Sequence, residues 1–406
     1  EQARLQMLTR DLVGAIRTGE RAIRLAGPLD DHATLSRAYN AVGSSLWFQR
    51  PAEAEPNLLA SRHHAELAQE PELVASALTN LGSGAGEVRL YDTANRWLDE
   101  VIDWCEPRDL DAMSDYATAW RARTALEQGD WTKAAQLAGR ALARMPVPIT
   151  QIVALTVLGL LRSRRGDPGA QNALHEAWRL SVQSGDLQRL WPVAVARAES
   201  GLWLHGEVGQ VDALREVMQL ARRHQHGWAI GELGTWLRRA GEAGDSAGAS
   251  GPYASWLGGD PSEAVTGWQA LGCAFDELLV HWDAATEPSL RQGLATAESL
   301  GATAVTARIR QKLRMLGVSS IPRGARKATS EHPAGLTARE SEIIGLMADG
   351  LSNADIAGRL VISTRTVDHH VSAILRKLGV ASRRDAVKAL PTVGGSAAQD
   401  RQPSPM

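Results

Sequence analysis

Cysteine is nearly absent from this sequence of 406 residues, and its scarcity narrows the class of protein. The two cysteines, Cys105 and Cys273, lie far apart, and neither belongs to a CxxC pair or to a Cys/His cluster with metal-ligand spacing. A disulfide framework is therefore excluded, no metal site is expected, and the chain fits a reducing compartment.

The sequence also lacks long apolar runs. No uncharged apolar stretch approaches the ~18–20 residues that a membrane span needs, and residues 1–30 lack the basic-then-apolar order of a signal peptide. We therefore expect a soluble, cytoplasmic protein with no membrane partner. Because the sequence opens at Glu1 directly in helical periodicity, without Met, we also expect that an upstream segment is missing.

Hydrophobic and charged residues are present in globular proportions, at 44% and 22%, which allows two or more domains with cores of their own. Charge is divided unevenly along the chain. Residues 321–390 hold 11 basic and 7 acidic residues, whereas residues 1–320 hold 32 basic and 38 acidic residues. A small basic module on a larger acidic body indicates an anionic partner at one end only.

Helical periodicity dominates from about residue 30 to residue 316, with Ala, Leu and Trp at three-to-four spacing and few alternating β-branched runs. Gly129-Asp130, Gly166-Asp167 and Gly206-Glu207 each end one predicted helix and precede another. Their spacings of about 37 and 40 residues are typical of two-helix solenoid repeats. The sequence therefore predicts a helical-repeat solenoid.

The clearest repeat is YATAWRARTALEQGDWTKAAQLAGRALA, residues 116–143. Small residues such as Ala125 and Ala138 at the helix crossing would let the two axes approach closely. This pattern resembles a degenerate tetratricopeptide repeat. We interpret the tryptophans of this region mainly as repeat core rather than as a ligand groove, including Trp104, Trp120, Trp131, Trp178 and Trp203.

Three segments break the helical pattern. Residues 240–252 are rich in Gly and Ser and predict a flexible loop, residues 321–335 predict a linker, and residues 392–406 predict a disordered tail. The resulting domains are a repeat region at 1–320, which would act as a sensor or interaction surface, and a C-terminal module at 336–391.

Helix caps divide the C-terminal module into four helices. Ser or Thr opens each helix, as Ser363 does for the third, and Gly350 and Gly379 supply left-handed ends. The predicted helices are residues 337–349, 352–361, 363–378 and 382–390.

The third predicted helix has two distinct faces. Its apolar stripe is Val367, Val371, Ile374, Leu375 and Leu378, and matching apolar positions on the first two helices are Ile343, Met347, Ile356 and Leu360. The opposite face carries Arg365, Asp368, His369, Ser372 and Arg376. A polar helix face is most often merely solvated, but the short helix-turn-helix spacing and the local positive charge favour entry into the major groove of DNA.

The segment GLTARESEIIGLMADGLSNADIAGRLVISTRTVDHHVSAILRKLGVASR, residues 335–383, resembles the LuxR-type helix-turn-helix domain. The family pattern is met by Leu336, Thr337, Arg339, Glu340, Gly350, Ser352, Asn353, Ile356, Ala357, Leu360, Ile362, Ser363, Thr366, Val367, His370, Lys377 and Leu378. Asp368 departs from it, because many members place Lys there. An Asp at this position could accept a hydrogen bond from cytosine N4, so operators of Lys-bearing relatives do not transfer.

The resemblance and the polar face together predict the site residues. DNA contacts are expected at Thr337, Ser352, Asn353, Ser363, Arg365, Thr366, Val367, Asp368, His369, His370, Ser372, Arg376 and Lys377. The fourth helix is expected to form the dimer contact, at Ser382, Ala386, Val387 and Leu390. Double-stranded DNA, RNA polymerase, a second copy of the chain and a protein or small-molecule effector on the repeats are the implied partners.

The body is similar, more loosely, to the C-terminal half of the large ATP-binding LuxR-type regulators, in which an NTPase precedes helical repeats. The sequence contains no Gly-Lys dipeptide and hence no phosphate-binding P-loop. No cofactor is therefore expected in this chain, and ATP could act only through a missing upstream domain.

Other motifs carry weaker signals. Residues 82–86, GSGAG, lack the third glycine of a nucleotide fingerprint and are expected to form a turn between helices. The pairs His63-His64 and His224/His226 do not share a helix face and are expected to be surface histidines. No nucleophile, base and orienting group occur together as an enzyme would need.

The sequence thus predicts an all-α, non-enzymatic transcription regulator: a tetratricopeptide-like solenoid followed by a four-helix LuxR-type DNA-binding domain. Two alternatives stay open. One is an interaction scaffold whose terminal domain has lost DNA binding, which Asp368 favours. The other is a phosphate-hydrolysing switch, which the missing P-loop disfavours.

Overall fold

The computed structural model describes residues 1–144, 146–321, 336, 338–348, 350–360, 363–380 and 382–388. The chain divides into two compact units, Glu1–Ile321 and Pro322–Met406, which we call the repeat unit and the C-terminal unit. Within the described residues every regular element is a helix and no strand occurs. The predicted all-α class is confirmed.

The helices of both units follow one another with short connections. The repeat unit contains α1 (Gln2–Leu8), α2 (Leu12–Ala26), η1 (Gly27–Leu29), α3 (His32–Leu46), α4 (Pro51–Leu67), α5 (Pro71–Glu87), α6 (Tyr91–Cys105), η2 (Glu106–Arg108), α7 (Asp111–Glu127), α8 (Trp131–Leu142), α9 (Pro148–Arg165), α10 (Ala170–Ser184), α11 (Leu187–His205), α12 (Val211–Arg223), α13 (Gly227–Arg239), α14 (Pro252–Leu257), α15 (Pro261–Ala270), α16 (Ala274–Ala284), α17 (Glu287–Ser299) and α18 (Thr303–Met315). The C-terminal unit contains α20 (Ala338–Ala348), α21 (Asn353–Leu360), α22 (Thr364–Leu378) and α23 (Arg383–Lys388).

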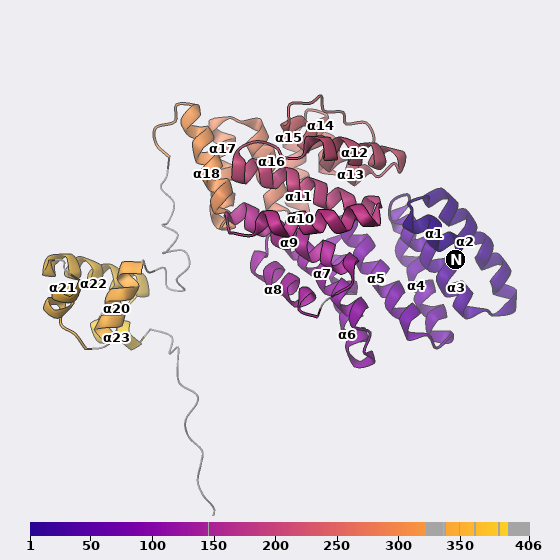
Figure 1. Ribbon diagram of the computed structural model, residues 1–406, viewed down its shortest axis with the longest axis horizontal. Coiled ribbons are helices and arrows are strands. Elements are labelled where there is room, and N and C mark those ends of the chain that lie inside the picture. Colours follow the sequence, from indigo (N-terminus) through magenta and orange to yellow (C-terminus); the bar gives the residue numbers. More distant parts are fainter. Residues whose placement is uncertain are drawn as a thin grey trace, which may run out of the picture. The chain divides into compact units, whose positions relative to one another are not determined.

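Consecutive helices of the repeat unit pack as hairpins, and the first helices of successive hairpins lie side by side (Figure 1). The hairpins are α3 with α4, α5 with α6, α7 with α8, α9 with α10, and α11 with α12. Glycines in the left-handed conformation end α9 at Gly166 and α11 at Gly206, where the sequence predicts turns. The predicted two-helix solenoid is confirmed.

Small residues bring α7 and α8 together, as the sequence of this repeat predicts. Asp130 caps α8 by accepting the Lys133 amide at 3.0 Å, and Ala125, Ala134 and Ala138 are buried at the helix crossing. A larger side chain at such a crossing would overpack it, at a cost of ~1–3 kcal/mol.

Tryptophan supplies much of the core volume of the repeat unit. Trp120, Trp131 and Trp203 are buried, which confirms their assignment to the core, whereas Trp104 and Trp178 are only half-buried. Other fully buried tryptophans that the core contains are Trp47, Trp191, Trp236 and Trp268.

The last helices of the repeat unit pack back onto the middle ones. α16 contacts α7, and α18 contacts α9 and α11. Arg308 of α18 donates to the backbone carbonyls of Trp203 and Leu204 at 3.1 and 3.0 Å, which satisfies acceptors at the end of α11. One hydrophobic core therefore extends from Tyr91 to Leu313, beyond the contacts between neighbouring repeats.

Residues 82–86, which we expected to form a turn, lie inside α5. That prediction is wrong because the glycines admit neighbouring side chains and do not reverse the chain. A Cβ atom on Gly82 would lie 2.6 Å from Leu98, and one on Gly84 would lie 2.1 Å from Trp47. Each glycine destabilises the helix by ~1 kcal/mol relative to alanine. The absence of a side chain at these positions lets α6 and Trp47 pack closely against α5.

His226 is buried, so its expected surface position is wrong. Its Nδ1 accepts the Ala229 amide at the start of α13, which leaves the proton on Nε2, and Nε2 donates to Glu87 at 3.0 Å. Arg10 and Gln188 donate to the same carboxylate at 2.7 and 2.8 Å. Segments from α5, α11, α13 and the turn before α2 therefore meet at Glu87.

The predicted loop before α14 is free of helix up to Gly251. Residues 322–335 of the predicted linker and the predicted tail at 392–406 lie outside the described residues. Across the described part of the chain, no helix is both long enough and apolar enough to cross a bilayer. The same part holds no group of three or more His, Cys, Asp or Glu side chains placed to bind a metal ion.

Candidate nucleic-acid interface

Capping residues fix the starts of α21 and α22. The Ser363 hydroxyl accepts the Thr366 amide at 3.1 Å, and Gly379, with a φ of 66°, ends α22 in the left-handed conformation. Before α21, Ser352 donates from its hydroxyl and its amide to Asp355, and these bonds hold the pKa of the Asp355 carboxyl below its ordinary value. The predicted caps at these helices are confirmed.

The apolar stripe of α22 packs into the core of the C-terminal unit, as predicted. Val367 and Ile374 are fully buried, and Val371, Leu375 and Leu378 pack against them. The facing positions on α20 and α21 that join this core are Ile343, Met347, Ile356 and Leu360. This packing fixes which face of α22 is directed outward.

The outward face of α22 is the polar face that the sequence predicts. Arg365, Asp368, His369, Ser372 and Arg376 are all exposed. Within the described residues, neither Arg365 nor Arg376 has a hydrogen-bond or ion-pair partner. An exposed guanidinium without a partner is available to phosphate or to a guanine edge.

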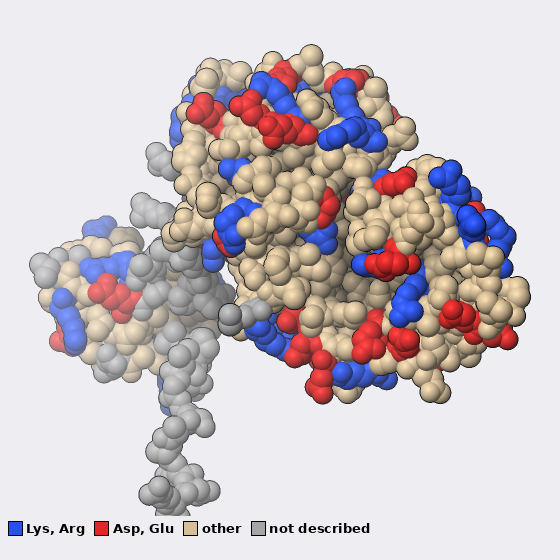
Figure 2. Space-filling model, turned by 45° about the vertical axis from the view of Figure 1, so that its right-hand side comes forward, with Lys and Arg blue, Asp and Glu red and all other residues tan. Residues whose placement is uncertain are grey.

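The repeat unit presents a different surface. On the face of this unit drawn in Figure 2, basic and acidic side chains lie intermingled. Many of them are paired, as Arg62 is with Glu66 at 2.9 Å and with Glu100 at 2.5 Å. Many arginines of the repeat unit thus take part in ion pairs, whereas Arg365 and Arg376 of α22 take part in none within the described residues.

Asp368 connects α22 to α21. Its Oδ1 accepts from the Asn353 side-chain amide at 2.7 Å, and Asn353 in turn accepts from Arg383 of α23 at 2.6 Å. Arg383 also donates to the Leu351 carbonyl. Asn353 and Asp368 therefore belong to a network that joins three helices, and Oδ2 of Asp368 keeps no partner within the described residues.

Other predicted DNA contacts have partners inside the unit. Lys377 donates to Glu340 at 2.6 Å, so its ammonium is engaged. The hydroxyls of Ser352, Ser363 and Thr366 make capping contacts. Val367 lies in the core, where its side chain faces away from solvent, because it belongs to the apolar stripe. His370 is half-buried, and Thr337 lies outside the described residues.

The predicted dimer strip on α23 is only partly at the surface. Ala386 is fully buried in the core of the C-terminal unit, so its side chain is not available to a second copy. The reason is that α23 turns its apolar side toward α20 and α22, which it contacts. Ser382 and Val387 are half-buried, and Leu390 lies outside the described residues.

Sequence reasoning missed Arg359 and Arg384 as candidate contacts. Both are exposed, at the end of α21 and on α23, and neither has a hydrogen-bond or ion-pair partner within the described residues. The excess of basic residues between positions 321 and 390 is the signal that could have found them. Both residues add exposed positive charge to the C-terminal unit.

The C-terminal unit has known relatives. Residues 334–390 match the family described as bacterial regulatory proteins, luxR family. Two proteins provisionally named HTH-type transcriptional regulators, from Mycobacterium bovis and Mycobacterium tuberculosis, are 46% and 44% identical to this chain over 61 residues. These matches cover 15% of this chain and 7% of the length of each relative. The C-terminal unit is therefore a LuxR-family helix-turn-helix domain.

A solved structure shows a much weaker likeness to this chain. A circular tandem repeat protein with novel repeat topology is 15% identical, and the alignment covers 78% of this chain and 93% of that one. The TM-score is 0.25, which carries no argument about fold or function. The architecture of the repeat unit rests on its own helix packing.

Proposed function

We propose that this chain is a sequence-specific DNA-binding transcription regulator, in which the repeat unit receives a signal and controls the LuxR-type domain. The observation that carries the proposal is the outward face of α22, where Arg365 and Arg376 are exposed and unpaired. The family match over residues 334–390 supports it. Because the relatives are matched over only 7% of their length, this function is inferred for the chain from its own residues.

In this proposal the N-terminal half of α22 enters the major groove. Arg365, Asp368 and His369 face base edges there, with Ser372 one turn further along, and Arg376 contacts phosphate. Arg359 at the end of α21 reaches the backbone on one side of the groove. The network from Asp368 through Asn353 to Arg383 keeps the three helices in register for this contact.

The remaining parts of the proposal concern partners. We expect two copies of the domain on a two-half-site operator, with α23 near the contact, and RNA polymerase as a further partner in the cytoplasm. A protein or small molecule bound to the repeats would change the fraction of binding-competent chain, and apparent DNA affinity would scale with that fraction.

Selection of duplexes from a random library, followed by fluorescence anisotropy with the full chain, tests this function. We expect an enriched sequence to bind more tightly than bulk DNA by ~10³-fold or more. Arg365→Ala should weaken binding, whereas Arg24→Ala, which removes an exposed arginine from α2 of the repeat unit, should leave it unchanged. Equal binding of all duplexes, or equal loss in both variants, would contradict the proposal.

The scaffold alternative rests on Asp368, whose negative charge lies on the DNA-facing surface. It predicts no binding to bulk DNA even at low salt, where phosphate contacts are strongest. The same anisotropy series at low ionic strength separates the two functions.

A further inference from the structure

A small cavity lies inside the repeat unit, between α7, α9 and α11. One wall is apolar and the other is charged. The apolar wall is formed mainly by Leu126, Ile149, Ile152, Val153, Leu160 and Val195. The charged wall is formed by Arg89, Arg123, Arg164, Arg189, Glu127, Glu199, Glu232 and Asp276.

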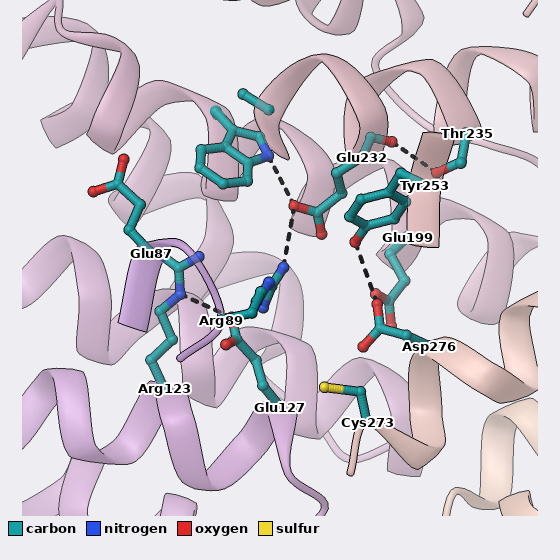
Figure 3. Close-up of polar contacts among 12 residues, drawn as sticks. Glu87, Arg89, Arg123, Glu127, Glu199, Glu232, Thr235, Tyr253, Cys273 and Asp276 are labelled. Carbon is teal, nitrogen blue, oxygen red and sulfur yellow. Dashed lines mark hydrogen bonds and ion pairs between the residues drawn. The ribbon is translucent and has the colours of Figure 1, made fainter. Parts of the chain in front are cut away.

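The four guanidinium groups of the cavity are already engaged by carboxylates, and Arg189 pairs with Asp186 at 2.5 Å. Arg89 and Arg123 share Glu127, at 2.5 and 2.9 Å, and Figure 3 shows Arg89 between Glu127 and Glu232. Arg164 makes a two-pronged contact with Glu199, at 2.7 and 3.1 Å. These pairs leave little positive charge for the other acidic groups.

Two carboxyl groups of the cavity therefore lack a close positively charged partner. Glu232 lies 3.7 Å from Arg89, a loose ion pair, and accepts from the Trp191 indole at 2.8 Å through the same oxygen, Oε2. Asp276 accepts at Oδ1 from the Tyr253 hydroxyl at 3.3 Å and has no ion pair within the described residues. Oε1 of Glu232 and Oδ2 of Asp276 have no hydrogen-bond partner within the described residues, and both residues line the cavity.

Burial affects the protonation of both of these carboxyl groups. Burial raises the pKa of Glu232 to about 7, even though Arg89 acts in the opposite direction, and burial likewise raises the pKa of Asp276. A buried carboxylate in this state gains from any cation that can enter.

The cavity adjoins a larger groove, which provides space for more than a head group. The cavity volume is about 70 Å³, and the adjoining groove, of about 420 Å³, shares Tyr116, Ile149, Gln188 and Arg189 with it. The cavity alone could hold a few water molecules or one small polar group. An elongated ligand would place its head beside Glu232 and Asp276 and its body along the α9 wall toward the groove.

We propose that this cavity binds an amphipathic cation, a protonated amine carried on an apolar body, with Glu232 and Asp276 as acceptors for the ammonium group. The proposal deepens the proposed signal-receiving role of the repeats by assigning it a site and a ligand class. An anionic ligand is disfavoured because each guanidinium of the cavity already contacts a carboxylate. Arg123 donates to Glu127 and also stacks on Trp120, with its guanidinium carbon 4.7 Å from the ring centre.

Isothermal titration calorimetry of the full chain with three probes of equal length tests the head group. Hexylammonium, hexanol and hexanoate are six-carbon molecules with apolar bodies of similar length, and they differ in the charge of the head group. We expect hexylammonium to bind more tightly than hexanol by about tenfold or more, since hydrogen bonds to charged groups contribute ~1.5–3 kcal/mol, and hexanoate not to bind. Binding of hexanoate as tight as that of hexylammonium, or no binding of hexylammonium, would overturn the proposal.

Variants locate the site. Glu232→Gln and Asp276→Asn keep size and hydrogen-bonding capacity, and each should weaken hexylammonium binding by about tenfold. Glu216→Gln, on the exposed side of α12, is the matched control and should bind as the parent does. Circular dichroism establishes that the variants are folded. Unchanged affinity in Glu232→Gln and Asp276→Asn would place the ligand elsewhere and overturn the proposal.

The outcome is independent of the DNA experiment, because calorimetry with these probes requires no DNA. A chain that binds an enriched duplex but no hexylammonium would refute the ligand site alone. A chain that binds hexylammonium but no duplex would refute the regulator function alone.

Discussion

The surroundings of Glu87 in the repeat unit and the outward face of α22 in the C-terminal unit use charged residues in opposite ways. In the repeat unit Glu87 is 1% exposed and receives hydrogen bonds from Arg10 and His226. In the C-terminal unit Arg365 and Arg376 are exposed, and no partner contacts them within the described residues. A buried and paired charge holds the chain in one conformation, whereas an exposed and unpaired charge is available to another molecule.

The presence of a charged residue in the sequence therefore does not reveal whether that residue stabilises the fold or binds another molecule. Counting charges along the sequence distinguishes an acidic body from a basic module, but it does not say which arginines are free. Arg121, for example, lies on α7 and contacts Asp99 at 2.6 and 3.1 Å, so it contributes to structure. Only the folded chain shows that the arginines of α22 have no such partner.

The largest expected effect follows from leaving a buried charge without its partner. Glu87→Ala removes the carboxylate from the Arg10 guanidinium, whose side chain is 7% exposed, and such a loss costs ~3–5 kcal/mol. Chemical denaturation of the full chain measures it. The control Glu53→Ala removes one half of an exposed pair with Arg50 and should cost at most about 1 kcal/mol. Equal losses would contradict the distinction between buried and exposed pairs.

Glu232 should behave in the opposite way to Glu87. Its pKa is raised by burial from 4.5 to about 7, in surroundings of Arg89, Asp276, Arg123 and Glu127, so the folded chain binds its proton more readily than the unfolded chain. The free energy of unfolding therefore falls as pH rises through this window.

Glu232→Gln should raise the free energy of unfolding by ~1–3 kcal/mol at pH 8 and change it little at pH 4.5. The glutamine can still accept from the Trp191 indole, so the contact itself is retained. Urea denaturation at the two pH values measures the difference. A variant that is less stable than the parent at pH 8 would show that the carboxylate is compensated after all.

Asp368 tests whether one charged residue can both join two helices and contact DNA. Its Oδ1 is engaged by Asn353, and its Oδ2 is open. Asp368→Asn can keep the first contact through its amide oxygen but replaces the open acceptor with a donor. If Oδ2 reads a cytosine, preference at one base pair should change by ~1–3 kcal/mol, measured by selection on parent and variant. An unchanged preference profile would restrict Asp368 to joining α21 and α22.

The smallest effects are expected from two neighbouring basic residues. Arg376→Ala should lower the slope of log affinity against log salt by about 1, because its guanidinium is free for phosphate. Lys377→Ala should leave that slope unchanged and instead lower the melting temperature, because its ammonium contacts Glu340. Salt titrations and thermal unfolding of both variants provide the comparison. A lowered slope for Lys377→Ala would show that this ion pair opens on DNA.

Features set by local spacing were predictable from the sequence. The cap at Ser363, the end at Gly379 and the two faces of α22 all depend on residues within a few turns of one another. Features that depend on a distant partner were not predictable from the sequence. Glu87 meets His226 across 139 positions, and Asp368 meets Asn353 from another helix.

The prediction for the glycines of α5 was wrong for the same reason, because their role depends on partners that are distant in the sequence. Gly82 and Gly84 look like turn residues until Leu98 and Trp47 are placed against them. Ala386 likewise has the spacing of a surface strip, and only the packing of α23 on α20 and α22 assigns it to the core. Local period predicts which side of a helix is apolar, but not which neighbour covers it.

The junction at Glu87 sets an order of events during synthesis. Repeats that contact only their neighbours can fold one after another as they leave the ribosome. Here His224 donates to the Arg10 carbonyl across 214 positions of sequence. At ~5–20 residues per second, the ribosome needs about 10–40 s to deliver that partner. In the part of this interval that follows the synthesis of Glu87, Arg10 and Glu87 can pair with each other but lack His226 at the start of α13.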